Sequence, residues 1–176
     1  MDKALAVMAY DAARGEIVLH SGWRGEFSGI AFSDTWTFGD RWQQHQPATV
    51  PPTRARAAMA YDAARAQCVL FGGDTLTSLL GDTWVWDGVD WSPRSPANSP
   101  PSRYGHGMAD DRARGRVVLF GGFDGTNELA DTWEWDGRDW RRSMSASAPQ
   151  ARWQPRLVYD AARGVTMLFG GYSSGG

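Results

Sequence analysis

The feature that most constrains the fold is an apolar segment closed by two small residues, which occurs four times along the chain. The copies read VLHSG, VLFGG, VLFGG and MLFGG, and they end at Gly22, Gly73, Gly122 and Gly171. Successive closing glycines lie 51, 49 and 49 residues apart. A period of this size indicates one supersecondary unit copied along the chain. The repeat therefore decides the fold class, and features present in every copy belong first to the scaffold.

Each copy has a short turn signal eleven residues before its closing glycine. The turns read Asp-Ala-Ala-Arg or Asp-Arg-Ala-Arg, and they start at Asp11, Asp62, Asp111 and Asp160. An Asp side chain can accept hydrogen bonds from its own turn, and the Gly that usually follows allows a positive φ. We therefore expect a first strand, strand a, to fold back on the glycine-closed strand b, for example 57–61 on 68–71.

Alternating aromatic residues indicate two further strands in each copy. The pattern of strand c is Asp-Thr-Trp followed two residues later by a second aromatic, and it occurs at 34–38, 82–86 and 131–135. A period of two is typical of a strand. Asp-Gly pairs at 87–88 and 136–137 predict a turn into a short strand d that ends at Trp91 and Trp140, with Trp42 in the first copy. Each full copy should hold four antiparallel strands.

The repeats predict an all-β architecture. The segments between strands, such as 92–102, are rich in Pro, Ser and Gly, and no window sustains an apolar period of 3.6 residues. Four-stranded sheets that recur at this spacing are typical of a propeller. Strand a is rich in Ala, Gly and Met, which suits the crowded innermost strand. We expect blades at 3–53, 54–102 and 103–151, and half a fourth at 152–176.

These features resemble the kelch repeats, in the version found in galactose-oxidase-like propellers. The matching features are the double glycine after strand b, the two Trp residues six or seven positions apart, and a Pro-x-x-Arg segment that ends at Arg54, Arg103 and Arg152. The resemblance covers essentially the whole chain and implies a β-propeller. The first copy departs from the pattern at Ser21, and the third has Asp110 where the other copies have Tyr.

The fourth copy contains strands a and b and no counterpart of strands c and d. Propeller rings have four to eight blades, which at this repeat length takes roughly 200 to 400 residues. We therefore expect a piece of a longer propeller, with an open or self-associating arc as the alternative. In either case Met167, Phe169 and the inner face of the first blade would lack a neighbour, and the exposed edge strands and apolar surface would favour association.

Antiparallel strand order makes the two faces of such an arc different. The b–c and d–a loops should emerge on one face, which we call the loop face, and the a–b and c–d hairpins on the other. The loop face carries most of the variation between copies, in 23–33, 74–81 and 123–130. Variable loops on a rigid scaffold are where recognition normally resides. We therefore look for a ligand site on the loop face.

A first group of candidate site residues is basic and recurs at the start of each strand a. Its members are Lys3, Arg54, Arg103 and Arg152. Guanidinium groups suit planar oxyanions, so this ring would hold a carboxylate, an acidic peptide or a sugar. A structural interpretation competes, because an Asp opens each strand c on the same face, at Asp34, Asp82 and Asp131. Arg-Asp pairing within or between blades would then explain the recurrence.

A second group of candidates is specific to single copies. Its members are Trp23, Arg24, Glu26 and Phe27 in the first b–c loop, Asp124 and Asn127 in the third, and His106 near the start of a strand a. Aromatic side chains beside charges suit sugar or peptide contacts, although a solvated loop is the alternative. His106 is expected to face the channel. A His without a paired acid or nucleophile is not a mechanism, so a non-catalytic role is favoured.

Composition narrows the partners and cofactors. The net charge is −2 and Arg is scattered among Asp and Glu, which argues against nucleic acid and an anionic membrane. Cys68 is the single cysteine, so no intrachain disulfide can form, and its apolar strand predicts a buried side chain. No signal peptide or membrane-spanning segment is apparent. No Tyr/His cluster accompanies Cys68, so the copper site of galactose oxidase is not carried over, and no metal or cofactor is expected.

Two functional hypotheses follow from the sequence. The first is a non-catalytic kelch-repeat module that binds a protein or a carbohydrate through its loop face. The second is part of a propeller enzyme, similar to galactose oxidase or sialic acid mutarotase, with catalytic residues in missing blades. The first is favoured because no constellation of acid, base or metal ligands is visible in the sequence.

Overall fold

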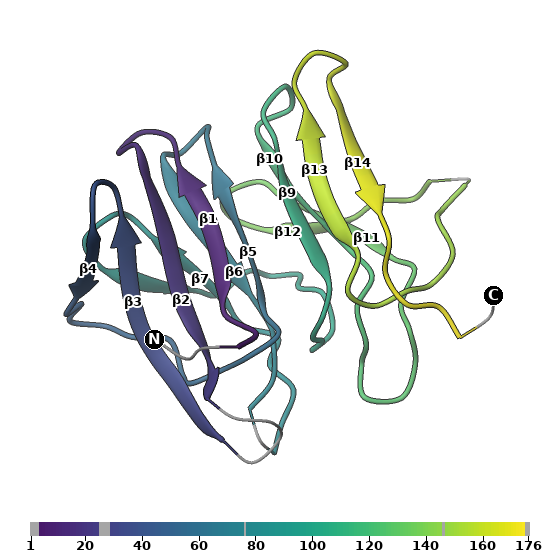
Figure 1. Ribbon diagram of the computed structural model, residues 1–176. Helices are drawn as coiled ribbons and strands as arrows, with labels where there is room; N and C mark the ends of the chain where they lie inside the picture. Colours follow the sequence, from purple (N-terminus) through teal and green to yellow (C-terminus); the bar gives the residue numbers. More distant parts are fainter. Residues whose placement is uncertain (1–3, 25–28, 76, 146, 175–176) are drawn as a thin grey trace.

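The computed structural model describes residues 4–24, 29–75, 77–145 and 147–174, and these residues form an all-β structure (Figure 1). The strands assemble into four antiparallel sheets, three with four strands and one with two, and none closes into a barrel. The sheets follow one another as the blades of an open, propeller-like arc (Figure 1), as predicted. Within the described ranges, no helix has the length and apolar character to span a membrane.

Each blade is a meander in which neighbouring strands of the chain are neighbours in the sheet. The first blade contains β1 (Val7–Asp11), β2 (Glu16–Arg24), β3 (Ile30–Phe38) and β4 (Trp42–His45). The second contains β5 (Ala58–Asp62), β6 (Gln67–Phe71), β7 (Thr83–Trp86) and β8 (Trp91–Arg94). The third contains β9 (Gly107–Asp111), β10 (Arg116–Phe120), β11 (Thr132–Trp135) and β12 (Trp140–Arg142). The last sheet contains β13 (Arg156–Asp160) and β14 (Val165–Phe169).

The innermost strands β1, β5, β9 and β13 contact one another in sequence order around the axis of the arc. Small side chains suit this position because the next blade lies close. A Cβ atom at Gly107 would lie 2.4 Å from Cδ1 of Leu157 and 3.2 Å from the carbonyl oxygen of Pro155, just before β13. The Ala-, Gly- and Met-rich composition of strand a therefore reflects its place at the axis.

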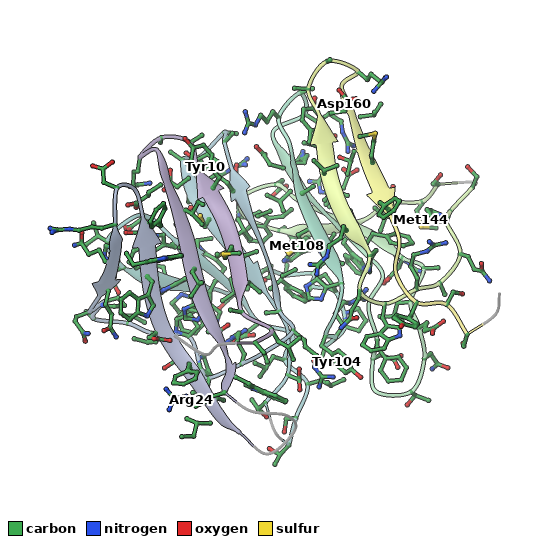
Figure 2. All side chains as sticks on the ribbon, in the orientation of Figure 1. Tyr10, Arg24, Tyr104, Met108, Met144 and Asp160 are labelled. Carbon is green, nitrogen blue, oxygen red and sulfur yellow. The ribbon has the colours of Figure 1, made fainter. Side chains whose placement is uncertain are left out.

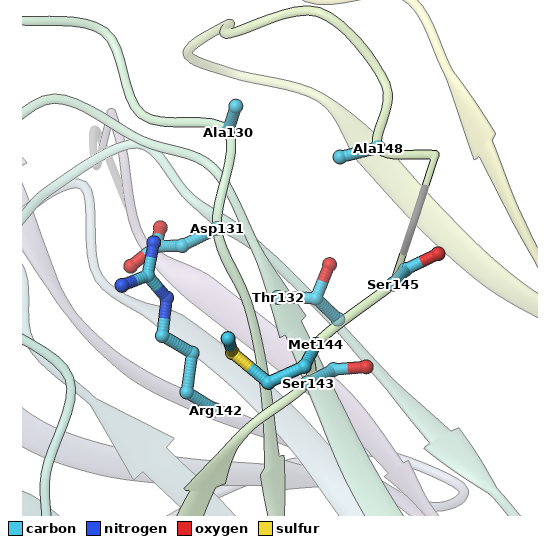
Figure 3. A pocket seen from close by; sticks show the side chains of 8 residues that line it. All are labelled: Ala130, Asp131, Thr132, Arg142, Ser143, Met144, Ser145 and Ala148. Carbon is cyan, nitrogen blue, oxygen red and sulfur yellow. The ribbon is translucent and has the colours of Figure 1, made fainter.

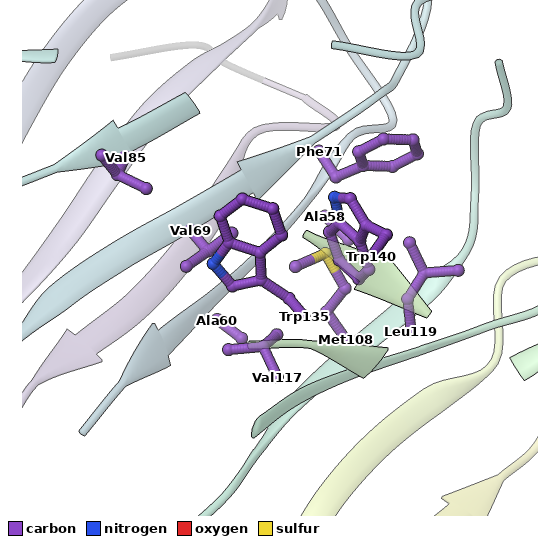
Figure 4. Packing of buried hydrophobic residues seen from close by; sticks show 10 residues of the cluster. All are labelled: Ala58, Ala60, Val69, Phe71, Val85, Met108, Val117, Leu119, Trp135 and Trp140. Carbon is purple, nitrogen blue, oxygen red and sulfur yellow. The ribbon is translucent and has the colours of Figure 1, made fainter. Parts of the chain in front are cut away.

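The hydrophobic core is divided into clusters that lie between blades. The cluster between the second and third blades includes Phe71 and Val69 from β6 and Trp135 and Trp140 from the third blade (Figure 4). The Phe71 and Trp140 rings meet at 5.3 Å between centroids. A second cluster joins the first and second blades and includes the buried Cys68. Burial raises the pKa of the Cys68 thiol, as expected for a cysteine that serves as a small apolar core residue.

The double glycine is required by both backbone conformation and space. Gly72 and Gly73 have φ values of 61° and 96°, a region that other residues rarely adopt. A Cβ on Gly73 would lie 2.6 Å from the carbonyl oxygen of Ala55, and one on Gly72 would lie 2.7 Å from that of Arg103. The chain thus leaves strand b through a turn pressed against its own strand a and the next blade.

The prediction that strand d ends at Trp91 and Trp140 is wrong, because β8 and β12 begin at these residues. In the second blade, Oδ1 of Asp87 accepts hydrogen bonds from the backbone N–H groups of Val89 and Asp90, both at 2.8 Å. This side-chain cap holds 87–90 as a loop, so cross-strand pairing resumes only where Trp91 lies opposite Trp86.

The first b–c segment also differs from the predicted loop at 23–33. β2 and β3 are nine residues long, and their pairing continues to Trp23 opposite Ala31 and Arg24 opposite Ile30. The register shifts between His20 and Gly22, so the hairpin continues past a bulge at the position where the other copies have their double glycine. Trp23 and Arg24 are therefore strand residues.

Candidate functional site

The loop face is assembled by short β-bridges between the d–a and b–c loops. Ala55 pairs with Asp74 in the second blade, and Tyr104 pairs with Phe123 in the third. In the first of these bridges, two backbone hydrogen bonds of 2.9 Å join Ala55 and Asp74. The residue three positions before strand a and the residue after the closing glycine therefore lie side by side in each copy.

Arg54 and Arg103 are fully buried in the second and third blades, with 0% of each residue exposed. The Arg54 guanidinium forms a bidentate pair with Asp82 at 2.8 and 2.7 Å, and it also donates to the carbonyl of Gly72 at 2.9 Å. Arg103 pairs in the same way with Asp131 at 2.6 and 2.9 Å. Both guanidinium groups are thus enclosed by contacts within their own blade, as the structural interpretation of the basic ring describes.

The carboxylates of these pairs are held in the ionised form. Burial disfavours the charge of Asp82, but hydrogen bonds and the positive charge of Arg54 outweigh burial and lower its pKa. The indole Nε1 of Trp84 adds a hydrogen bond of 2.6 Å. Asp131 has a lowered pKa for the corresponding reasons, with Arg103 and Trp133 as its partners. The Asp-Thr-Trp pattern of strand c therefore encodes this paired site.

The fourth copy repeats half of this arrangement. Arg152 donates to the carbonyl of Gln150 at 3.0 Å and to that of Gly170 at 3.0 Å. Its counterparts Arg54 and Arg103 make the same two kinds of backbone contact. No carboxylate in the described part of the chain pairs with Arg152. Lys3, the fourth member of the ring, lies outside the described residues.

The candidate residues of the first blade differ in how exposed they are. Trp23 is buried, and the guanidinium carbon of Arg56 lies 5.6 Å from its ring centroid. Arg24 is exposed and stacks over Phe32 at 5.7 Å. Glu26 and Phe27 lie outside the described residues. Of the described candidates here, Arg24 is the one that solvent reaches directly.

Asp124 and Asn127 lie in the exposed b–c loop of the third blade. Asp124 Oδ1 accepts hydrogen bonds from the backbone N–H of Thr126 at 2.8 Å and of Asn127 at 2.7 Å. These bonds lower the pKa of Asp124 and shape the loop. Asn127 lines a cleft of about 440 Å³ between this loop and the fourth copy, together with Phe123, Glu128 and Gln150.

His106 is buried at the start of the third strand a and also borders a groove along the inner strands. Its ring meets the edge of Phe71 at 5.5 Å. Burial, followed by the nearby charge of Arg103, lowers the pKa of His106 to about 3, against smaller opposing effects of the Phe71 backbone and Asp131. The imidazole is therefore neutral at physiological pH and packs between blades.

A row of aromatic side chains crosses the loop face, and Trp23 is its one member among the residues predicted from the sequence. The Tyr104 and Phe123 rings lie 5.6 Å apart, Tyr104 and Trp153 lie 6.1 Å apart, and Trp153 and Tyr172 lie 5.8 Å apart. Arg56 extends the row by stacking over Tyr104 at 3.9 Å. We call Trp23, Arg56, Tyr104, Phe123, Trp153 and Tyr172 the aromatic row.

The repeat register contains the signal that would have found this row. Tyr104 and Trp153 directly follow the Arg of the Pro-x-x-Arg segment, and Trp23, Phe123 and Tyr172 directly follow the closing glycine. The β-bridges place these two positions side by side in every copy. In Figure 2, Tyr104 lies near one end of the blades. Tyr10 and Asp160 lie near the opposite end, with the a–b hairpins.

Across the described ranges, no three His, Cys, Asp or Glu side chains gather closely enough to hold a metal ion. A scan of protein-family models and a search of curated proteins find no match to this sequence. The residues of the loop face are therefore the basis for a functional proposal.

Proposed function

We propose that this chain is a non-catalytic, kelch-repeat binding module that recognises a protein or a carbohydrate through its loop face. The observation that supports this proposal is the aromatic row, in which rings from neighbouring copies are in contact. Aromatic faces bind sugar rings and peptide side chains at little conformational cost, because each ring has only two rotatable bonds. Arg56 adds a charged group to the row, and its guanidinium forms a bidentate pair with Asp74 at 2.8 and 2.6 Å.

The cleft beside the row supplies the polar contacts that such a ligand needs. Phe123 belongs both to the aromatic row and to the cleft lining, next to the side chains of Asn127, Glu128 and Gln150. Apolar contact area with a few convergent polar groups is typical of ligand sites. This combination supports recognition of a ligand that has both a ring or apolar face and hydrogen-bonding groups.

A glycan array and a peptide array test the proposal. We expect wild-type chain to bind members of one class, and Tyr172→Ala to weaken that binding by about tenfold or more, as removal of a contact anchor does. Tyr172 is 68% exposed, so its removal leaves the core intact. Tyr10→Ala is the matched control, because Tyr10 is 56% exposed in β1, near the hairpin end.

Two outcomes would contradict the proposal. One is a chain that folds but binds no member of either array. The other is a ligand whose binding survives Tyr172→Ala and Phe123→Ala but is lost in Tyr10→Ala, since recognition would then use the hairpin end.

A further inference from the structure

One repeat position on the loop face has a left-handed backbone in every copy, although its residue differs. It is occupied by Leu5, Arg56, Gly105 and Gln154, with φ values of 59°, 52°, 62° and 56°. Backbone hydrogen bonds join these residues from blade to blade. Arg56 donates to the carbonyl of Leu5 at 3.2 Å, Gly105 donates to that of Arg56 at 2.8 Å, and Gln154 donates to that of Gly105. Three copies carry a side chain at this position, so the fold accepts one there.

The third copy lacks a side chain at this position, and space does not force the glycine. A Cβ atom on Gly105 would lie 3.4 Å from Cε3 of Trp153 and 3.5 Å from Cγ of Gln154, both ordinary van der Waals distances. A longer side chain at Gly105 would lie against the Trp153 ring. The glycine therefore leaves uncovered a part of that ring which any of the other copies' side chains would contact.

Aromatic and hydrogen-bonding groups surround Gly105. The Tyr104 and Trp153 rings lie 6.1 Å apart at an interplanar angle of 89°, and both side chains are partly exposed. Gln154 is exposed and presents its side-chain amide. Arg56 lies over the Tyr104 ring at 3.9 Å. We call Arg56, Tyr104, Gly105, Trp153 and Gln154 the Gly105 site.

The charge at the Gly105 site is already paired. Arg56 donates from Nε and Nη2 to the two carboxylate oxygens of Asp74, and the guanidinium has more N–H donors than this pair uses. The guanidinium of Arg152, which precedes the aromatic ring, donates to the carbonyls of Gln150 and Gly170 in its own copy. Arg56 therefore offers hydrogen bonds from a neutralised pair, which suits a hydroxyl better than a carboxylate or phosphate.

A pocket on the third blade offers polar groups without a stacking surface. It has a volume of about 350 Å³, and Asp131, Thr132, Arg142 and Met144 are among its lining residues (Figure 3). The described residues of this lining include no aromatic side chain. A ligand that needs both an aromatic face and hydrogen bonds is therefore matched better by the Gly105 site.

We infer that the Gly105 site is a subsite for a neutral pyranose ring, and that the ligand class recognised by the loop face is an uncharged glycan. This inference rests on the proposed loop-face function. A pyranose has an apolar C–H face and a rim of hydroxyl groups. Its C–H face packs on Trp153 beside Gly105, and its hydroxyl groups form hydrogen bonds with Arg56 and the Gln154 amide.

Glycan and peptide arrays separate this inference from the proposed function. The glycan array holds neutral, uronic-acid-containing and sialylated oligosaccharides, and the peptide array holds neutral and acidic sequences. We expect the wild-type chain to bind neutral oligosaccharides and to keep this binding at high salt, because Arg56 is already paired with Asp74. Binding confined to peptides or to acidic glycans would overturn this inference and leave the loop-face function standing. A folded chain that binds neither array would overturn both.

Substitution of Gly105 tests the place of the subsite. In calorimetric titrations with the neutral oligosaccharide that binds most strongly, Gly105→Leu should weaken binding about tenfold or more, because its side chain covers the Trp153 ring. The fold should accept this leucine, since Leu5 has the same backbone conformation in the first copy. Gly105→Ala is the matched control. It has the same positive φ but a side chain that ends at Cβ, so it should weaken binding less than about threefold.

Saturation-transfer NMR tests the stacking contact in the wild-type chain. Irradiation of the aromatic protons should transfer saturation to the ring C–H protons of the same oligosaccharide, and Trp153→Leu, which keeps an apolar side chain, should reduce this transfer. Thermal unfolding verifies that each variant is folded. Equal affinities of the wild-type and Gly105→Leu chains, or saturation transfer that Trp153→Leu leaves unchanged, would overturn the inference.

Discussion

At the scale of single residues, the buried Arg103 is the clearest example of a repeated side chain with a structural task. It contacts two backbone carbonyls, one from the d–a loop and one from the double glycine, and a carboxylate at the start of strand c. A guanidinium has enough donors to satisfy all three partners at once. The b–c and d–a loops of a blade are therefore tied together at the base of the loop face.

Loss of the carboxylate that pairs with Arg103 should destabilise the folded protein. In Asp131→Asn the fully buried Arg103 keeps its charge and loses its counter-ion, so we expect the free energy of unfolding to fall by about 3 kcal/mol. Urea unfolding followed by tryptophan fluorescence measures the loss. Glu134→Gln is the control, because Glu134 pairs with the exposed Arg114 and should cost less than about 1 kcal/mol. Similar losses in the two variants would contradict a special role for the buried pair.

His106 predicts a specific dependence of stability on pH. Its pKa is about 3 in the folded chain and about 6.5 when unfolded, so below pH 6.5 the unfolded state binds a proton that the folded state excludes. The contribution of His106 to stability is fully present above pH 6.5 and is lost as the pH falls toward 3. Each pH unit within that window should shift the unfolding equilibrium toward the unfolded state by up to about tenfold.

The variant His106→Ala isolates this effect from the titration of carboxylates. Ala occupies the corresponding position in the first two copies, at Ala6 and Ala57. The packing loss in the variant does not depend on pH, so the stability difference between wild type and variant should change steadily between pH 6.5 and 4. Parallel pH profiles in urea unfolding would show that His106 is not buried in its neutral form.

At the scale of elements, the a–b hairpins show how local sequence sets the strands. Oδ1 of Asp11 accepts hydrogen bonds from the N–H groups of Ala13 at 3.0 Å and Arg14 at 3.2 Å, as the turn signal predicts. The residue before the second strand has a positive φ in every copy, and it is Gly15, Gly115 or Gly164 in three of them. In the second copy Ala66 has a φ of 53°.

Replacement of Ala66 should stabilise the protein. An L-residue with a side chain is strained in the left-handed region, so Ala66→Gly is expected to raise the free energy of unfolding by about 1 kcal/mol. Ala64→Gly in the same hairpin is the control, and its effect should have the opposite sign. It adds flexibility to the unfolded chain at a position that needs no positive φ, so it should lower the free energy of unfolding. Thermal unfolding distinguishes the two variants. A loss of stability in Ala66→Gly would contradict backbone strain at Ala66.

The strands that sequence predicts best are those with local signals. Hairpins and aromatic alternation gave strands a, b and c, because turn chemistry and a period of two depend on neighbouring residues. The start of strand d was misplaced because one side chain, that of Asp87, caps the loop and delays pairing. The long hairpin of the first blade was missed because the one sequence departure at its bulge, Ser21 in place of Gly, does not by itself indicate that strand pairing continues.

The candidate site was harder to predict than the fold because it depends on contacts between copies. The basic positions were recognisable, but their burial is set by packing and by the carboxylate of a distant strand. The aromatic row requires Arg56 of one blade to lie over Tyr104 of the next, and no local pattern encodes that distance. Trp23 was expected as an exposed ligand contact in the first b–c loop, whereas pairing of β2 with β3 and the approach of Arg56 bury it.

At the scale of the whole molecule, the blades are joined by a few recurring polar ties as well as by the core. Trp91 and Trp140 each donate to a threonine of the preceding blade. Near the hairpin ends, Arg14 donates to the carbonyls of Ala66 and Asp87 in the next blade, and Arg65 donates to that of Gly115. Backbone hydrogen bonds also join neighbouring blades at the loop face, such as the bond of 2.9 Å from the N–H of Gly73 to the carbonyl of Arg103. Both faces are therefore tied, and the loop face in addition presents the aromatic row.

We therefore place recognition at the loop face and assign a purely structural role to the hairpin face. Hydrogen exchange measured with and without the strongest ligand from the arrays tests this division most directly. We predict that the ligand slows amide exchange in the loop-face segments 123–129 and 153–154 and leaves the hairpins at 63–66 and 112–115 unchanged. Slowed exchange confined to those hairpins, with the loop face unaffected, would contradict the account.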